Sequence, residues 1–133
     1  MDCAVSEKLM CYPPSVRASL TLIRKHIFDV AEKLDKDVEE SLKWGQLSYV
    51  VKGGTAIRLD WDDNNPAYLI ILFHCQTQMI ETLREVMPES FVYKGNRAAL
   101  LDLQHDIPLS ELQTCIEVAF TYKARKGLFL LGL

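Results

Sequence analysis

The segment of residues 43–49 places two aromatic side chains and several hydrogen-bonding groups close together in the chain. Trp44 and Tyr49 supply flat apolar surfaces, and Lys43 supplies a positive charge. Aromatic walls with a few convergent polar groups are typical of pockets for small molecules. The segment therefore predicts a site for a small ligand or a peptide near Trp44 and Tyr49. The alternative is that Trp44 only closes the edge of the core.

Two arginines extend this candidate site. A glycine pair at residues 53–54 separates two strand-like runs, which predicts a two-residue hairpin turn. In that register Tyr49 lies opposite Arg58 and shares one face of the sheet with it. Arg97 belongs to a second expected hairpin, whose turn is Gly-Asn at residues 95–96. The predicted ligand-binding residues are Lys43, Trp44, Tyr49, Arg58 and Arg97.

Acidic side chains form a second cluster just before this segment. Its members are Asp35, Asp37, Glu39 and Glu40. Carboxylates are ligands for hard cations, so the cluster offers a weak, exposed metal site. The alternative is helix capping, in which Asp37 caps a helix and Glu40, three residues later, completes a capping box.

The chain shows no signature of catalysis. It contains no nucleophile elbow, phosphate-binding loop or dinucleotide-binding fingerprint. Cys75 and Cys115 lie in apolar runs, where a thiol stays protonated and inert. His74 precedes Cys75 at the end of an expected strand, but adjacent strand residues point to opposite faces, so the two do not share one metal ion. We therefore expect no catalytic residues, no metal and no cofactor.

Composition narrows the class of partner and the compartment. The formal net charge is -3, and no basic stripe with aromatic platforms accompanies it, so we expect no nucleic-acid partner. No apolar run reaches the roughly 18 residues that a membrane span needs. The four cysteines form no Cys-x-x-Cys pair, and the N-terminus lacks the pattern of a secretory signal. These features predict a soluble cytoplasmic protein with reduced thiols.

Periodicity and turn residues predict the elements that position these side chains. A helix begins at the proline pair of residues 13–14 and buries a stripe from Val16 to Leu34, and a short helix from Asp37 ends at Gly45. Later helices begin near Thr77 and Pro108. The run 68–74 predicts a central strand buried on both faces. The other expected strands are 49–52, 55–59, 91–93 and 98–103.

The expected order is α-α-β-β-β-α-β-β-α. Strands joined by tight turns pair antiparallel, so we predict an α+β fold: a mainly antiparallel five-stranded sheet with helices packed on it. All 133 residues belong to one domain. Residues 1–12 form a weakly ordered lead-in. The apolar tail of residues 127–133 docks on the chain's own sheet or on a second subunit, which makes a homo-oligomer an alternative.

The chain resembles the YdhG-like family of domains of unknown function. The resemblance lies in the acidic pair Glu39 and Glu40 followed by Lys-Trp-Gly at residues 43–45 and by Ser48 and Tyr49, with Leu47 where the family usually has proline. Arg17, residues 95–98 and residues 119–122 also fit the family's layout, so that the likeness covers about residues 12–126. It implies a small α+β fold. Some relatives are described as frataxin-like intracellular iron chaperones, which implies iron at the acidic cluster.

These observations favour a non-enzymatic binding module for an unknown small ligand or protein, with its site near Trp44 and Tyr49. One alternative is a frataxin-like iron chaperone that uses Asp35, Asp37, Glu39 and Glu40. The other is a structural protein that assembles through the apolar tail.

Overall fold

The computed structural model describes residues 3–133. Two helices come first, followed by four strands, a helix, two more strands and the C-terminal helices. The elements are α1 (Cys3–Met10), α2 (Pro14–Lys33), β1 (Glu39–Lys43), β2 (Gln46–Val50), β3 (Ile57–Trp61), β4 (Tyr68–Leu72), α3 (Met79–Val86), β5 (Val92–Lys94), β6 (Ala98–Asp102), α4 (Leu109–Phe120), α5 (Tyr122–Arg125) and the 3₁₀ helix η1 (Phe129–Gly132).

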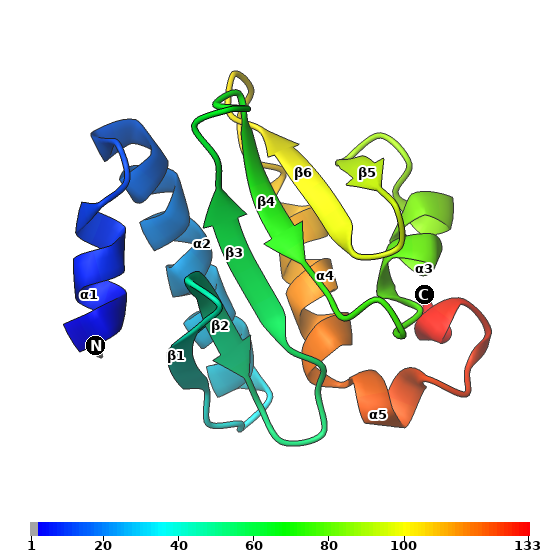
Figure 1. Cartoon of the computed structure of the whole chain (residues 1–133). Helices are drawn as coiled ribbons and strands as arrows, with labels where there is room; N and C mark the ends of the chain where they lie inside the picture. The colour runs from blue at the N-terminus through cyan, green and yellow to red at the C-terminus, as the bar shows by residue number, and fades with distance from the viewer. Residues whose placement is uncertain (1–2) are drawn as a thin grey trace.

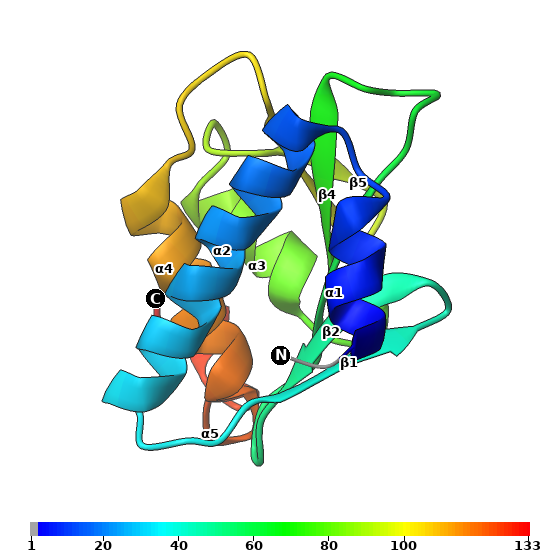
Figure 2. The ribbon, with the colours of Figure 1, turned by 90° about the vertical axis from the view of Figure 1, so that its left-hand side faces the viewer.

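The strands pair antiparallel in one six-stranded sheet of order β1-β2-β3-β4-β6-β5. The α+β class and the antiparallel sheet are therefore confirmed, with six strands where five were expected. Helices α2, α3 and α4 lie on one side of this sheet (Figures 1 and 2). None of the described helices covers the opposite face, which is open toward the viewer in Figure 1.

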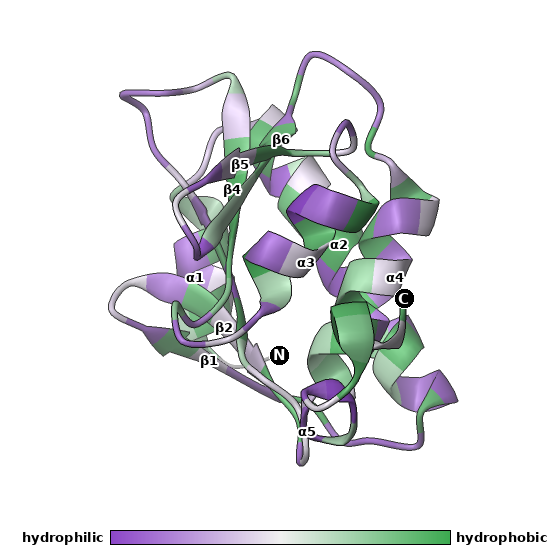
Figure 3. Ribbon diagram, turned by 90° about the vertical axis from the view of Figure 1, so that its right-hand side faces the viewer, coloured by the Kyte–Doolittle hydropathy of each residue, from purple (hydrophilic) through white to green (hydrophobic). Residues whose placement is uncertain are grey.

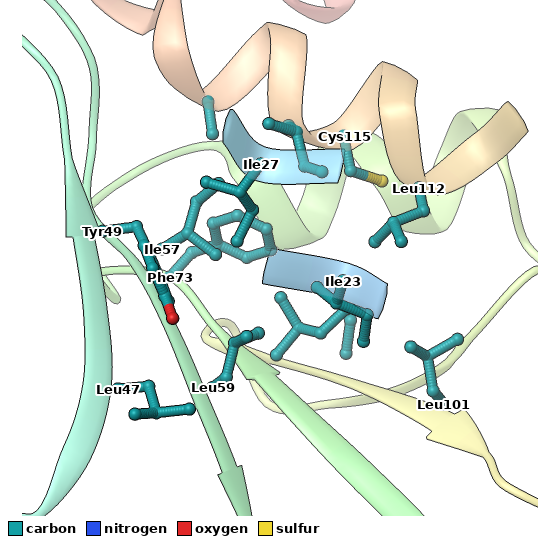
Figure 4. Close-up of a cluster of buried hydrophobic side chains, with 14 of the residues drawn as sticks. Ile23, Ile27, Leu47, Tyr49, Ile57, Leu59, Phe73, Leu101, Leu112 and Cys115 are labelled. Carbon is teal, nitrogen blue, oxygen red and sulfur yellow. The ribbon is translucent and has the colours of Figure 1, made fainter. Parts of the chain in front are cut away.

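One core lies between the sheet and the helices. The apolar stripe of α2 is confirmed, since Leu20, Ile23 and Ile27 are fully buried. Figure 4 shows Ile23 and Ile27 between Leu112 and Cys115 of α4 and the inward side chains of the strands. Figure 3 shows hydrophobic residues alternating with hydrophilic ones along the helices, and hydrophilic residues in several of the connecting loops. Burial of this apolar surface is the main force that holds the helices on the sheet.

The short helix expected from Asp37 to Gly45 is wrong. Residues 39–43 form β1, which pairs with β2 so that Lys43 lies opposite Gln46. The two residues between the strands, Trp44 and Gly45, have φ angles of 54° and 75°. Positive φ at both central residues is the geometry of a tight hairpin turn that matches the twist of the strands. Gly45 therefore turns a hairpin and does not end a helix.

The expected pairing of β2 with β3 is also wrong by one residue. Ser48 lies opposite Arg58, and Tyr49 lies opposite Ile57. A shift of one residue moves a side chain to the other face of the sheet, so Tyr49 and Arg58 point in opposite directions. The cause is the glycine pair at residues 53–54, which lies inside a longer loop between the two strands and does not form a two-residue turn.

Two further expectations, for the N-terminal residues and for the central strand, are also corrected. The weakly ordered lead-in is wrong for residues 3–10, which form α1 and bury Val5 and Leu9; residues 1–2 lie outside the described part of the chain. Arg17 fixes the end of α1, because its Nε donates to the carbonyl oxygen of Leu9 at 3.0 Å.

In β4, Leu69 and Ile71 are buried, but Ile70 is only partly buried because it faces the open side. The central strand is thus fully buried on one face only.

Candidate ligand-binding site

The structure separates the two aromatic residues of the expected site. Trp44 lies at the tip of the β1–β2 hairpin with 91% of its surface exposed, and Lys43 beside it is also exposed. Tyr49 is 0% exposed and lies on the face of the sheet that the helices cover. The segment 43–49 therefore does not form two walls of one pocket, and Trp44 does not close the core.

Tyr49 belongs to a buried polar group beneath α2. The guanidinium of Arg24 holds the Glu40 carboxylate in a bidentate pair, with nitrogen–oxygen distances of 2.5 and 3.0 Å. The ring of Phe28 meets the ring of Tyr49 edge to face at 6.2 Å between centroids. Burial, and after it the nearby Glu40 carboxylate, raises the pKa of the Tyr49 hydroxyl. This group ties β1 and β2 to α2 and leaves Tyr49 without access to solvent.

Arg58 and Arg97, the two arginines of the expected site, line the same cavity. Its volume is about 150 Å³, and it lies where β4 ends and β3 begins. Arg58 reaches it from the open face of β3, next to Leu72 of β4. Arg97 reaches it from the loop between β5 and β6. We call this the basic cavity; its lining residues are Ala56, Arg58, Leu72, Phe73, His74, Cys75 and Arg97.

Hydrogen bonds to backbone carbonyl oxygens hold the two sides of the basic cavity together. The amide of Phe73 donates to the carbonyl oxygen of Arg97 at 2.8 Å. The side-chain amide of Asn96 donates to the carbonyl oxygen of Cys75 at 3.1 Å. The segment after β4 is therefore joined to the β5–β6 loop, and the position of Arg97 is fixed relative to Arg58. These contacts join residues more than twenty positions apart, so no local sequence pattern predicts them.

One ring nitrogen of His74, at the basic cavity, accepts a hydrogen bond from the chain itself. Nδ1 of His74 accepts the backbone amide of Gln76 at 3.1 Å, so in the neutral ring the proton lies on Nε2. Thr77 closes the same turn by donating its hydroxyl to the carbonyl oxygen of His74 at 2.7 Å. His74 can thus donate a hydrogen bond from Nε2 to a bound acceptor. In the sequence, His74 and Cys75 stand out as a dipeptide, but no local pattern links them to the arginines.

Both guanidinium groups are available for a ligand. Among the interactions of residues 3–133, neither Arg58 nor Arg97 takes part in an ion pair or a side-chain hydrogen bond. Arg24 and Arg125, by contrast, are paired with Glu40 and Glu117. Two unpaired positive charges at one concave site attract an anion.

The cysteines divide into two environments. Cys115 is buried between α4 and the sheet, and that burial raises the pKa of its thiol to about 12. The apolar surroundings expected for Cys115 are therefore confirmed. Cys75 is exposed at the basic cavity, so the expectation of an apolar environment is wrong there.

The acidic residues do not converge. Glu40 points toward α2 and is held by Arg24, whereas Glu39 is the next residue of the same strand and points to the other face. Asp35 lies before β1 in a left-handed backbone conformation with a φ of 55°. Within the part of the chain that the structure describes, no three histidine, cysteine, aspartate or glutamate side chains are grouped so as to hold a metal ion. The iron site stays a prediction.

The C-terminal residues pack on the chain's own helices in part. Leu131 is buried, while Phe129 is 87% exposed. In Figure 1 this segment passes between α5 and α3 at the edge of the molecule. No described helix combines the length and the apolar composition that crossing a membrane requires.

Comparison with known proteins adds no relative: no family model, no curated protein and no solved structure matches this chain. The YdhG-like resemblance therefore stays a prediction, and the basic cavity itself is the main indication of function.

Proposed function

We propose that this chain is a binding module for a small oxyanion, or for the anionic end of a larger ligand, held between Arg58 and Arg97. The observation that carries the proposal is that Arg58 and Arg97 line one cavity and that neither has a partner among the described side chains. A guanidinium presents parallel N–H donors that match the two oxygens of a carboxylate or phosphate.

The size and the lining of the cavity support this class of ligand. Pockets for drug-sized molecules usually measure about 300–1,000 Å³. A cavity of about 150 Å³ suits a phosphate or a carboxylate group. Leu72, which lies opposite Arg58, gives the cavity an apolar side, and the Nε2–H of His74 adds a third donor. Trp44 and Tyr49 have no part in this site.

Calorimetric titration of the whole chain with inorganic phosphate, and separately with a small dicarboxylate, tests the proposal. We expect one of the two anions to bind, and Arg58→Gln and Arg97→Gln each to weaken binding. A hydrogen bond to a charged group contributes about 1.5–3 kcal/mol, which corresponds to a loss of roughly ten- to a hundredfold. Arg97→Lys keeps the charge but not the paired donors, so its loss should be intermediate.

Two control variants show whether anion binding depends on the basic cavity. Lys33→Gln removes one positive charge from the exposed side of α2, on the far side of the sheet. Trp44→Ala removes the exposed aromatic residue of the hairpin tip. Both should bind as the unchanged chain does. Equal affinity for all variants, or no binding of either anion, would rule the proposal out.

A further inference from the structure

The C-terminal segment holds a large aromatic side chain in solvent. Phe129 is 87% exposed and its neighbour Leu128 is 52% exposed, whereas Leu131 is completely buried. An aromatic ring carries much of the apolar area that drives protein–protein association. Side chains of this kind, gathered at one place on a surface, mark interaction sites.

The exposure of Phe129 is fixed by contacts on either side of it. Arg125 donates from Nη1 to the carbonyl oxygen of Leu131 at 2.9 Å and from Nε to the Thr121 hydroxyl at 2.7 Å. Leu130 and Leu131 both have left-handed backbone angles, with φ of 49° and 53°. That conformation costs roughly 1–2 kcal/mol per residue, and buried Leu131 together with Arg125 holds it in place. Phe129 is therefore presented to solvent by an anchored segment.

A groove runs between this segment and α3. It measures about 540 Å³ and is lined by Leu128, Phe129 and Leu130 on one side. Glu81 and Glu85, one helical turn apart on α3, line the other side. The groove has room for an aromatic side chain from a partner, and it presents negative charge at its edge.

Positive charge lies on the other side of the same segment. Lys123 on α5 and Lys126 just after it are both exposed. Both α5 and α3 contact η1. Figure 1 shows the C-terminal segment between these two helices. Within residues 3–133, none of Glu81, Glu85, Lys123 and Lys126 forms an ion pair. Acidic residues on α3, apolar residues of the C-terminal segment and basic residues on and beside α5 therefore follow one another along this end of the molecule.

We infer that the chain forms a two-fold symmetric dimer through this surface, with Phe129 of each copy in the groove of the other. A two-fold interface brings the same patch together from both copies, so it needs a patch that complements itself. A two-fold axis between Phe129 and the groove places Phe129 of each copy in the groove of the other, and it sets the acidic edge of one copy against the basic edge of the other. The two unpaired glutamates and two unpaired lysines then neutralise each other across the interface. This inference is independent of the basic cavity.

A lipid surface is the competing occupant, because exposed leucine and phenylalanine beside lysine also suit a membrane interface. The two glutamates at the groove repel anionic lipid, and this favours a second copy of the chain. The two occupants predict different results: a dimer forms without lipid, whereas a membrane anchor leaves the chain monomeric in solution.

Sedimentation equilibrium of the whole chain over a range of concentrations tests the inference. We expect a monomer–dimer equilibrium that Phe129→Ser weakens by about tenfold or more. Reversing the acidic edge with E81K and E85K should weaken it similarly, because lysines then face lysines. Adding K123E and K126E to that variant should restore dimerisation, since the edges again complement each other. A misfolded chain would not regain dimerisation when two more residues are substituted, so recovery of the dimer shows that charge pairing is responsible.

Glu7→Lys, on the exposed side of α1 at the far end of the molecule, is the matched control and should leave the equilibrium unchanged. A chain that is monomeric at every concentration overturns the inference. Monomers that bind vesicles of anionic lipid in a Phe129-dependent manner assign the surface to a membrane instead. Failure of the fourfold variant to recover dimerisation also contradicts the proposed charge pairing.

Discussion

At the scale of single residues, Glu40 shows how position on a strand decides the role of a charge. Its side chain is 8% exposed and accepts two hydrogen bonds from Arg24, whose side chain is 23% exposed. Glu39, one residue earlier, is exposed on the opposite face and forms no ion pair with any described residue. The sequence presents the two as an equivalent acidic pair, because only the pairing of β1 with β2 distinguishes them.

The same contrast gives a prediction for stability. Glu40→Gln should lower the free energy of unfolding by about 1–3 kcal/mol, because it leaves the Arg24 guanidinium partly buried without its counter-charge. Glu39→Gln, the matched substitution next to it, should change the free energy by less than about 0.5 kcal/mol. Urea unfolding followed by circular dichroism measures both. Equal effects of the two substitutions would contradict the role assigned to the Arg24–Glu40 pair.

At the scale of secondary-structure elements, the sequence predicts the elements that are long enough to repeat an apolar pattern several times. Helix α2 repeats its apolar stripe over twenty residues, so its face and its extent follow from the spacing. Strand β1 has only five residues, and its one apolar side chain, Leu42, gives no period to measure. The basic cavity is likewise predicted only in part. Arg58 and Arg97 are predicted from the sequence to share a site, but only the order of the strands shows which loops close around them.

The glycine pair of residues 53–54 shows why a strong turn signal leads to an incorrect register. A Cβ at Gly54 would lie 2.9 Å from the carbonyl oxygen of Ala119 and 2.9 Å from the Cα of Phe120. The loop is also bound to the end of α4, because the amide of Thr55 donates to the carbonyl oxygen of Ala119 at 2.8 Å. Glycine is thus required at residue 54 by the close approach of a distant helix. Sequence alone does not distinguish that requirement from the need for a tight turn.

This contact predicts the effect of a single methyl group. Gly54→Ala should destabilise the chain by about 1–3 kcal/mol, because the closest atoms of α4 belong to the backbone and cannot move aside independently. Gly127→Ala is the control: nothing lies within 4 Å of its Cβ position, so its effect should be neutral or slightly stabilising. Thermal unfolding of the two variants provides the comparison. A Gly54→Ala chain as stable as the parent would show that the loop does not press on α4.

At the scale of the whole molecule, the helices α2, α3 and α4 enclose one core against the sheet, and titratable groups are buried with it. Burial raises the pKa of the Cys115 thiol to about 12. It also raises the pKa values of Tyr12, Tyr49 and Tyr93, with Asp60 contributing at Tyr12 and Glu40 at Tyr49. All four groups are neutral when protonated, so the fold favours their neutral forms.

The expected consequence is a loss of stability at alkaline pH. Above the ordinary thiol pKa of 9.0 the unfolded chain releases the Cys115 proton while the native chain keeps it until about pH 12. The unfolded state then binds fewer protons, so the free energy of unfolding falls as pH rises, by about 1.4 kcal/mol per pH unit for each such group. The tyrosines add to the slope above their ordinary pKa of 10.0.

Urea unfolding at intervals from about pH 8 to 11 measures this slope. Cys115→Ala should unfold more easily at every pH because it leaves a small cavity, but its stability should fall less steeply between about pH 9 and 11. Cys75→Ala removes a thiol that is exposed to solvent in the folded chain, so the slope of the parent should remain. If Cys115→Ala and the parent lose stability equally steeply with pH, the core does not hold the thiol neutral. In that case α4 packs more loosely against the core at Cys115 than the structure shows.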